Sequence, residues 1–383
     1  MKNLFTTEVK LTITENKPGS SGTIALPQSM KAVVNYGPRD YRLEEVAVPE
    51  VGPDEILIKV ESCGVCASDI KCYEGASMFW GGNGSPPYVK GPVIPGHEFV
   101  GHVAKLGERA TQTRNLQIGE RVIAEQIVPC WQCRYCKRGQ YWMCQVHDIF
   151  GFQNNVNGGW AQYMKFPAAS LIHKVPNDIP ERLAVLIEPL SCSIHAVERG
   201  RIEFGDVVVL AGAGPLGLGM IGAAKRKTPS KLIVLDMNDK RLALAKQFGA
   251  DIVMNPAKED VVGKVLEMTD GYGCDVYIES TGHPASVGQG LAMIRKLGRF
   301  VEFSVFNQPA SVDWSIIGDR KELDIYGAHL GPYAYPKAIE FLDKELISMQ
   351  GVVTHVLPLE DFQHALDMVH EGQESIKVVL KPE

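Results

Sequence analysis

The second half of the chain alternates continuous apolar runs with helical segments, and this pattern limits the possible folds more than any other feature. Residues 207–211 read Val-Val-Val-Leu-Ala, and residues 232–236 read Leu-Ile-Val-Leu-Asp. Further strand-like runs lie at residues 252–253, 275–278, 300–303 and 323–326. Strands that are apolar on both faces and alternate with helices are typical of a doubly wound parallel sheet. The sequence therefore predicts an α/β protein with such a sheet over residues 188–330.

A glycine-rich turn follows the first of these runs. Gly212, Gly214 and Gly217 form the pattern G-x-G-x-x-G, with Leu216 inside it, between an apolar strand and a helix. The first glycine permits a tight turn, the second lets backbone approach a pyrophosphate, and the third lets the helix pack on the strand. Free N–H groups at the helix N-terminus would bind the phosphates. The unit predicts a Rossmann dinucleotide-binding domain; the alternative is a strand–turn–helix with a structural role alone.

Several later residues bear on the choice of cofactor. Asp236 ends the next apolar run, 24 residues after Gly212. Its carboxylate can accept hydrogen bonds from ribose hydroxyls and would repel a 2′-phosphate, so we expect NAD rather than NADP. Arg241 is either a cofactor residue beside the adenine or a solvated helix arginine. Ser304 and Val305, which follow a later strand-like run, complete the predicted cofactor site.

The first half of the chain has a different pattern. Short strand-like runs, broken by glycine and proline, lie at residues 30–34, 56–60, 100–103 and 121–124. This pattern predicts an irregular, β-rich domain over residues 1–187, in which residues 1–28 form an extension. Residues 331–383 return to helix, loop and a last strand at 376–380, and we expect this tail to close back onto the first domain.

Composition narrows the class of protein. Of 383 residues, 45% are hydrophobic and 22% are charged, and the formal net charge is −6. Two domains can bury sizeable cores at this length, and no long basic run indicates nucleic acid or an anionic membrane as partner. No apolar stretch reaches the roughly 20 residues that span a bilayer, and the N-terminus lacks the apolar region of a secretory signal. We therefore expect a cytoplasmic protein without a membrane partner.

Four of the nine cysteines lie within one short segment. Cys130, Cys133, Cys136 and Cys144 supply four thiolates within 15 residues. Four soft ligands with no position for water are typical of a closed, structural zinc site. An iron–sulfur cluster is the main alternative, and four reduced cysteines without metal is the other. Neighbouring Trp131 suggests a small knuckle, which favours zinc.

A second set of metal-ligand types is scattered along the chain. Cys66 precedes Ser68, His97 precedes Glu98, and Glu188 lies in the segment Ile-Glu-Pro-Leu. One thiolate, one imidazole and carboxylates form a mixed set that leaves room for water or substrate, as in catalytic zinc sites. Each residue alone is a weak signal.

Together these motifs resemble the zinc-containing medium-chain dehydrogenase/reductase family from Met30 onward. They come in that family's order: C-x-S-D, G-H-E, a four-cysteine lobe, I-E-P-L and GAGPLG. The resemblance implies a GroES-like catalytic domain beside a Rossmann domain, two zinc ions per chain, and NAD. It is nearest to the branch of polyol and threonine dehydrogenases, because Glu188 stands where classical alcohol dehydrogenases have a further cysteine.

The resemblance also implies roles for single residues. Cys66 and His97 are expected to ligate the catalytic zinc, with Glu98 as a ligand or an immediate neighbour. Glu188 is expected to bind the zinc directly or through water, in possible exchange with Glu98. Asp69 would fix the tautomer of His97, whereas Cys63 is expected to be a buried cysteine without a catalytic role.

The implied reaction is hydride transfer from a small alcohol to the nicotinamide. Zinc would act as a Lewis acid on the substrate oxygen, and Ser68 would take the hydroxyl proton. Many family members have a histidine three residues after this serine, where this chain has Lys71. The proton path beyond Ser68 is therefore not given by the resemblance.

The substrate class follows from the branch. We expect a small polyol and its ketose, with a four-carbon polyol such as erythritol or threitol as one candidate and threonine or another secondary alcohol as the alternative. A dinucleotide-binding protein without catalysis, which serves as a sensor or a structural protein, is the alternative of another class. Assembly as a homodimer or homotetramer is expected from the family. Candidate pocket residues, each with core packing as its alternative role, are Phe79, Trp80, Phe152 and His329.

Overall fold

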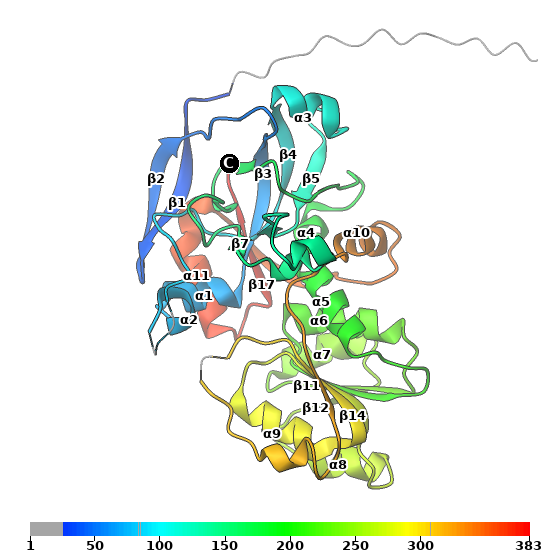
Figure 1. The fold of residues 1–383 in the computed structure, drawn as a ribbon. Coiled ribbons are helices and arrows are strands. Elements are labelled where there is room, and N and C mark those ends of the chain that lie inside the picture. The colour runs from blue at the N-terminus through cyan, green and yellow to red at the C-terminus, as the bar shows by residue number, and fades with distance from the viewer. Residues whose placement is uncertain (1–25, 83, 85, 307) are drawn as a thin grey trace, which may run out of the picture.

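The computed structural model describes residues 26–82, 84, 86–306 and 308–383. The larger part of the predicted N-terminal extension, residues 1–25, lies outside the described residues. A β-rich unit built around a seven-stranded sheet stands above an α/β unit built around a six-stranded sheet (Figure 1). The C-terminal strand and helix return to the β-rich unit, beside strands from near the start of the chain.

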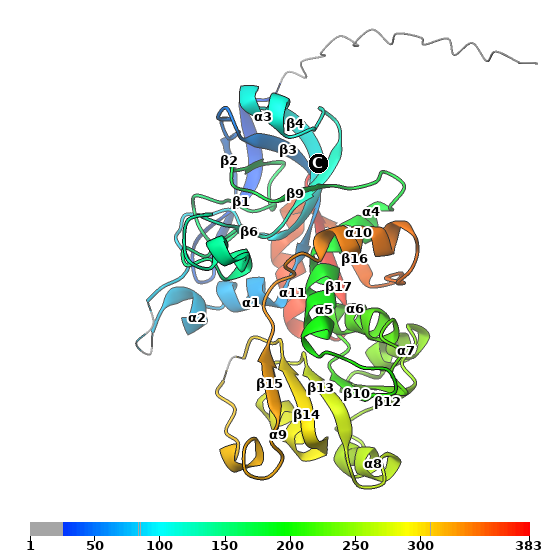
Figure 2. The same cartoon turned by 45° about the vertical axis from the view of Figure 1, so that its right-hand side comes forward.

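The six-stranded sheet is parallel throughout and confirms the predicted doubly wound fold. Its strand order is β12-β11-β10-β13-β14-β15. The chain adds strands outward on one side of β10 and then on the other, so the switch point lies between β10 and β13. Figure 2 shows β15, β14, β13 and β10 side by side. Each predicted apolar run of this part overlaps one of its strands, although Asp236, Phe303 and Leu323 lie one residue outside. The strands are β10 (Val207–Ala211), β11 (Lys231–Leu235), β12 (Ile252–Met254), β13 (Cys274–Glu279), β14 (Ile294–Glu302) and β15 (Asp324–Gly327).

Helices cover both faces of this sheet, which explains why its strands are apolar on both sides. Val208 and Leu210 of β10 face the core that contains α5 (Ile187–Arg199), α6 (Pro215–Lys225) and α7 (Asp239–Gln247). Val209 and Ala211 face α8 (Val261–Met268) and α9 (Pro284–Met293). Burying one such aliphatic side chain contributes about 1.5–3 kcal/mol, so both faces of the strand stabilise the sheet.

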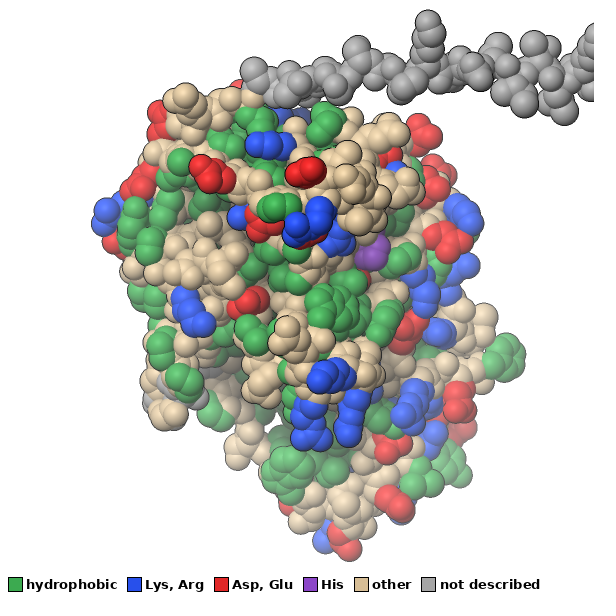
Figure 3. Space-filling view, turned by 45° about the horizontal axis from the view of Figure 1, so that its top comes forward, with side chains coloured by type: hydrophobic (Ala, Val, Ile, Leu, Met, Phe, Trp, Pro, Cys, Tyr) green, Lys and Arg blue, Asp and Glu red, His purple; other side chains and the backbone are tan. Residues whose placement is uncertain are grey.

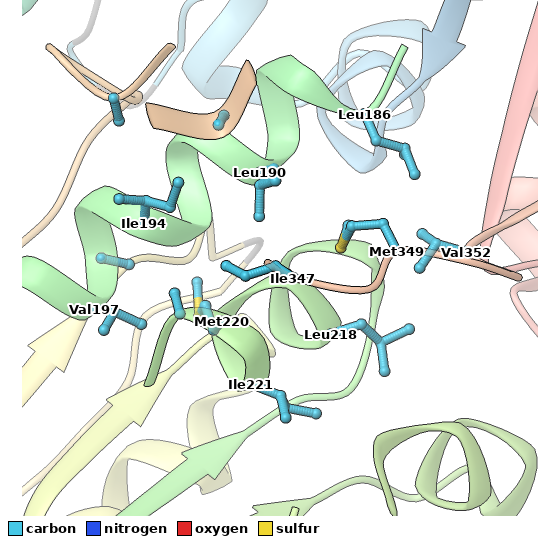
Figure 4. Close-up of a cluster of buried hydrophobic side chains, with 14 of the residues drawn as sticks. Leu186, Leu190, Ile194, Val197, Leu218, Met220, Ile221, Ile347, Met349 and Val352 are labelled. Carbon is cyan, nitrogen blue, oxygen red and sulfur yellow. The ribbon is translucent and has the colours of Figure 1, made fainter. Parts of the chain in front are cut away.

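The core beneath α5 joins the two units. Ile123 and Val379, which belong to the seven-stranded sheet, lie in the same buried cluster as the residues of α5 and α6. This contact fixes α5, which carries Glu188, relative to both sheets. Figure 4 shows side chains of this cluster, which come from α5 and the residue before it, from α6 and from the segment before β16: Leu186, Leu190, Ile194, Val197, Leu218, Met220, Ile221, Ile347, Met349 and Val352.

The seven-stranded sheet pairs the C-terminal strand with a strand formed by residues 56–65. Its order is β16-β17-β3-β4-β5-β9, and β8 (Tyr163–Phe166) also pairs with β3. The last strand runs antiparallel to β3, with Leu380 opposite Cys63, as the predicted return of the tail requires. The strands are β3 (Ile56–Val65), β4 (Glu98–Leu106), β5 (Arg121–Ala124), β9 (Ile172–Lys174), β16 (Val353–Pro358) and β17 (Lys377–Lys381).

Shorter elements complete the β-rich unit. Two hairpin-like pairs are β1 (Ser29–Gly37) with β2 (Asp40–Ala47) and β6 (Ile127–Val128) with β7 (Asp148–Ile149). The helices are α1 (Ala67–Tyr73), α2 (Ser77–Trp80), α3 (Glu108–Thr113), α4 (Glu181–Ala184), α10 (Tyr335–Asp343) and α11 (Phe362–Glu371).

The surface carries both signs of charge. Acidic and basic side chains are interspersed over the face shown in Figure 3, in keeping with the sequence's modest net charge. In the described part of the chain, every helix is too short or too polar to cross a membrane.

Candidate functional site

Two adjoining pockets lie where the β-rich unit meets the α/β unit. One is lined by the predicted catalytic residues and by the ends of β13 and β14. The other is lined by the glycine-rich turn after β10. Cys66, Glu98 and Leu216 line both, so the two pockets meet at the metal-ligand types. This is the switch point of the parallel sheet, where open α/β folds bind their ligands.

Pairing of β3 with β4 brings the predicted metal ligands together. Cys66 follows β3 and precedes α1, whereas His97 and Glu98 stand at the start of β4. Gly64 lies opposite Glu98 in the ladder, and a Cβ there would lie 2.0 Å from Glu98 Oε2. The ligand atoms of Cys66, His97 and Glu98 all lie within 4.8 Å of one another. A thiol, an imidazole and a carboxylate at this spacing fit a zinc ion and leave a position open.

His97 is buried and held between two neighbours. Its Nδ1 lies 3.5 Å from Asp69 Oδ1, and its Nε2 lies 3.5 Å from Ser68 Oγ. Asp69 also accepts a hydrogen bond of 2.9 Å from the backbone N–H of Cys66 through Oδ2. Burial works to lower the pKa of His97, but the Asp69 carboxylate and Cys66 outweigh it and raise that pKa well above its usual value. The surroundings of the imidazole therefore favour a positive charge, as a metal ion would supply.

Glu98 forms a buried ion pair with Lys377, a residue that the sequence motifs did not indicate. Lys377 Nζ of β17 lies 2.7 and 2.6 Å from the two carboxylate oxygens, and both side chains are buried. Lys377 also donates to the carbonyl of Val65 at 3.2 Å. Burial works to lower the pKa of Lys377, but Glu98 raises it above its usual value. The ammonium thus fixes the orientation of the Glu98 carboxylate.

Glu188 lies in the same pocket but outside the group of three closely spaced ligand atoms. It is the second residue of α5, and its Oε1 accepts hydrogen bonds from the amide of Gln126 and from the thiol of Cys192, the latter at 3.2 Å. Burial, followed by repulsion from Glu98, raises the pKa of Glu188 to about 7. A cation bound nearby would favour the charged form of Glu188 and so offset the effects that raise its pKa.

The wall of the pocket away from the α/β unit is largely apolar. Phe79 and Phe152 stack with ring centroids 5.2 Å apart, and Phe152 lies 5.4 Å from the ring of His97. His329 also lines this pocket, as predicted. The prediction for Trp80 is wrong: its indole N–H donates to the carbonyl of Cys72 at 2.7 Å, and it does not line the pocket.

Lys71 joins the β-rich unit to the α/β unit. Its ammonium donates to the backbone carbonyl of Val305, and burial lowers its pKa. It lines the pocket together with Ser68 and Ser304. Cys63, in contrast, is fully buried in the core of the β-rich unit and lines neither pocket, as expected of a cysteine without a catalytic role.

The glycine-rich turn forms an open cradle for a dinucleotide. Gly212 has φ +106, a conformation that favours glycine, and a Cβ on Gly217 would lie 2.0 Å from the carbonyl oxygen of Gly212. Gly214 caps α6 and has no atom within 4 Å of the place where a Cβ would lie. A dinucleotide phosphate could therefore approach the backbone at Gly214 and the N-terminus of α6, so the turn fits the cofactor.

The other predicted cofactor residues divide between the two pockets. Asp236 and Arg241 line the pocket of the glycine-rich turn, whereas Ser304 and Val305 line the pocket of the metal-ligand types. Asp236 accepts the backbone N–H of Ala213 at 2.7 Å through Oδ2. Arg241 donates to the carbonyl of Gly372 at 2.8 Å, while its Nε is buried without a hydrogen-bond partner in the described part of the chain.

The four-cysteine segment folds into a compact lobe between β6 and β7. The sulfur atoms of Cys130, Cys133, Cys136 and Cys144 all lie within 4.8 Å of one another. Backbone N–H groups donate to these sulfurs, for example Cys130 to Cys144 Sγ at 3.3 Å. Hydrogen bonds from the backbone around Cys136 and Gln145 lower the pKa of Cys133 to about 6. Four sulfur atoms in this arrangement fit a tetrahedral zinc ion.

Several residues of the site were missed by sequence reasoning. They are side chains outside the recognised motifs, which the fold brings to the two pockets: Tyr88, Gln126, His147, Cys192 and Lys377. The nearest available signal was the position of His147, three residues after Cys144.

Comparison with known proteins identifies families and relatives with similar sequences. The family model "Alcohol dehydrogenase GroES-like domain" matches residues 52–177, and the model "Zinc-binding dehydrogenase" matches residues 215–344. An erythritol/L-threitol dehydrogenase of Mycolicibacterium smegmatis is 54% identical, over 93% of this chain and 99% of its own. A sorbitol dehydrogenase of Bacillus subtilis is 34% identical, over 94% of this chain and 99% of its own.

A solved structure is similar as well. It is a putative zinc-binding dehydrogenase from Sinorhizobium meliloti bound to NADP, 25% identical in sequence. The superposition has a TM-score of 0.83 and covers 93% of this chain and all of that one. The arrangement of both units is therefore shared with a dinucleotide-binding protein.

Proposed function

This chain belongs to the zinc-containing medium-chain alcohol dehydrogenase family, and on that premise we propose that it interconverts a small polyol and its ketose with NAD. It is an alcohol oxidoreductase. A four-carbon polyol, erythritol or threitol, is the proposed substrate, because the relative with that activity is 54% identical over nearly the whole chain.

One observation carries the proposal: the closely spaced Cys66, His97 and Glu98 adjoin the dinucleotide cradle. Leu216 of the glycine-rich turn lines the pocket that contains these three ligand types. A hydroxyl oxygen near Cys66 and a nicotinamide that extends from the cradle would thus share one cavity. A sensor without catalysis has no need for this combination.

The proposed mechanism divides the work between bound groups and the chain. Zinc and NAD supply, when bound, a Lewis acid for the hydroxyl oxygen and an acceptor for the hydride. Ser68 is the residue proposed to accept the hydroxyl proton while it passes its own proton onward, since its Oγ lies beside His97 in the pocket. Asp69 holds His97, and Lys377 holds Glu98, so that both remain aimed at the metal position.

The roles of the two glutamates follow from their surroundings. Glu98 would be a ligand or immediate neighbour of a catalytic zinc, and Glu188 would bind that zinc directly or through water. The pKa of Glu188, raised to about 7 by burial and Glu98, would fall again beside the positive ion.

NAD is the proposed cofactor rather than NADP. The fixed carboxylate of Asp236 would repel a 2′-phosphate, although Arg241 lies in the same pocket. The proposed contacts of the dinucleotide are with Gly212, Gly214, Leu216, Gly217, Asp236, Arg241, Ser304 and Val305.

The remaining parts of the proposal concern metal count, assembly and location. Two zinc ions are proposed per chain, one catalytic and one in the lobe of Cys130, Cys133, Cys136 and Cys144. A homodimer or homotetramer and a cytoplasmic location are proposed from the family. The boundaries of the domains are proposed at residues 187/188 and 330/331.

A panel of substrates tests the proposed function. Purified protein is assayed with erythritol, threitol, sorbitol, threonine and 2-butanol, each with NAD and with NADP, by the absorbance of the reduced nicotinamide. The proposal expects the highest kcat/KM with a four-carbon polyol and NAD. Preference for threonine would replace the substrate class, and strong preference for NADP would contradict the role given to Asp236.

A further inference from the structure

Two histidines that the catalytic mechanism does not use face each other in the substrate pocket. His147 Nε2 and His329 Nε2 lie 3.2 Å apart, and the two rings stack with centroids 5.1 Å apart. His147 comes from the loop between the cysteine lobe and β7, and His329 comes from the loop after β15. Both residues line the pocket that contains Cys66 and His97.

A chain of aromatic contacts through Phe152 and Tyr88 connects His97 with His147 of the pair. The ring centroids of His97 and Phe152 lie 5.4 Å apart, and those of Phe152 and Tyr88 lie 6.0 Å apart. The ring centroids of Tyr88 and His147 lie 5.9 Å apart. Apolar side chains that line the same pocket include Met78, Phe79, Ile149, Phe152 and Leu330. The histidine pair thus adds hydrogen-bonding groups to a pocket that also has many apolar side chains.

Neutral imidazoles give this pair a specific hydrogen-bonding capacity. Burial lowers the pKa of His147, and burial together with repulsion from His147 and His195 lowers the pKa of His329 to about 4. Each neutral ring carries one N–H donor and one bare nitrogen acceptor. At 3.2 Å, one Nε2–H therefore donates to the other Nε2. A hydroxyl group, which both donates and accepts, can replace this contact by bridging the two nitrogens.

Both histidines are held in place by the chain around them. His147 has φ +59, a conformation uncommon outside glycine, and its carbonyl accepts a hydrogen bond of 2.8 Å from the hydroxyl of Tyr88. Backbone conformations of this kind are often retained at binding sites. On the other side, the N–H of Tyr333 donates to the hydroxyl of Tyr141 at 2.8 Å, which ties the segment after His329 to the cysteine lobe.

We propose that His147 and His329 together bind a hydroxyl group of the substrate that is remote from the reacting carbon, and so select polyols over simple alcohols. This inference rests on the proposed function, because it assumes a polyol in this pocket. The cysteine lobe would then contribute to substrate binding as well as to stability, because it supports both loops that carry the pair.

The test compares one substitution on two substrates. His329→Phe keeps an aromatic ring for stacking but removes the hydrogen bonds, and it is assayed with erythritol and with 2,3-butanediol, which has the same carbon chain without the terminal hydroxyls. We expect kcat/KM for erythritol to fall about tenfold or more, mainly through KM, because a single lost hydrogen bond has about this effect. The value for 2,3-butanediol should remain within about threefold.

Matched variants separate recognition from structure. His329→Asn, which keeps a donor and an acceptor, should recover part of the activity with erythritol. His195→Phe is the control, because His195 is a half-buried neighbour on α5 that does not line the pocket. Thermal unfolding and quenching of protein fluorescence by NADH check that each variant is folded and binds cofactor.

Each outcome decides between defined alternatives. Equal losses on both substrates, or an unchanged kcat/KM with erythritol, would overturn the role of the pair. If the wild-type protein oxidises 2,3-butanediol but no polyol, the proposed substrate class fails and the inference fails with it. If wild-type oxidises erythritol and only the His329→Phe comparison disagrees, the proposed function stands and the pair has a structural role.

Discussion

Lys377 Nζ lies 2.6 Å from Glu98 Oε2 in a buried ion pair, although 279 residues separate the two in sequence. The last strand of the chain thus stabilises the orientation of a residue at the candidate metal position. Removing one partner of a buried pair leaves an uncompensated charge, which typically costs about 3–5 kcal/mol.

The first prediction follows from this pair. Lys377→Met should lower the free energy of unfolding by about 3–5 kcal/mol, measured by denaturant titration. Lys381→Met on the same strand removes a largely exposed pair with Glu181 and should cost less than about 1 kcal/mol. The double variant Lys377→Met with Glu98→Gln should recover part of the loss, and an additive result would show that the two charges do not interact.

The second prediction concerns the cysteine lobe. Cys133→Ser should lose one zinc ion per chain and lower the melting temperature, while the zinc at Cys66 stays, because the lobe lines neither pocket. If His147 is positioned by the lobe, KM for the polyol should also rise. Metal content by atomic emission, read beside thermal unfolding, checks this. A variant with full zinc content and stability would contradict the structural assignment.

The third prediction concerns Lys71. Because its ammonium is engaged by the carbonyl of Val305, Lys71→Met should loosen that segment and raise KM for NAD several-fold. The pH profile of kcat should keep its shape, since an amine held by a carbonyl is not the expected proton acceptor. A displaced pH profile would instead make Lys71 part of the proton path beyond Ser68.

The fourth prediction concerns stability in acid. The pKa of His329 is lowered to about 4 in the folded chain, below its ordinary value of 6.5, because burial disfavours the charged ring. The unfolded chain therefore binds more protons in this window, so stability is full above about pH 6.5 and falls as the pH approaches 4. His329→Phe should lose less stability over this range than wild-type.

The matched comparison for acid stability is His364→Phe, because His364 is exposed on α11. This variant should follow the wild-type curve. If His329→Phe also follows the wild-type curve from pH 6.5 to 4, the neutral buried state of His329 would be contradicted.

Much of the fold could be predicted because its cause is local. The run Val207–Ala211 is apolar at every position, and the strand is buried on both faces as that pattern requires. Apolar runs mark only the buried part of a strand, however. β14 begins at Ile294, six residues before the apolar run, because Arg295 and Lys296 occupy exposed or partly exposed positions that hydrophobicity does not reveal.

The site was predicted where its residues form motifs and missed where they do not. Cys66, His97 and the four lobe cysteines have characteristic neighbours, and the structure gathers each set. Lys377 and His147 have none, because they reach the pockets through strand pairing and loop packing over long separations. The prediction that Trp80 lines the pocket was wrong because adjacent helix residues point in different directions. Phe79 therefore faces the pocket and Trp80 does not.

The measurement that tests the central claim most directly is the oxidation of erythritol with NAD by wild-type and Cys66→Ser proteins. The account predicts that wild-type forms reduced nicotinamide and releases the ketose. It also predicts that Cys66→Ser loses at least about a thousandfold in kcat/KM while keeping NAD binding and the zinc of the lobe, as expected when the group stabilising the developing charge is removed. Retained activity in Cys66→Ser, or no activity of wild-type with any polyol, would contradict it.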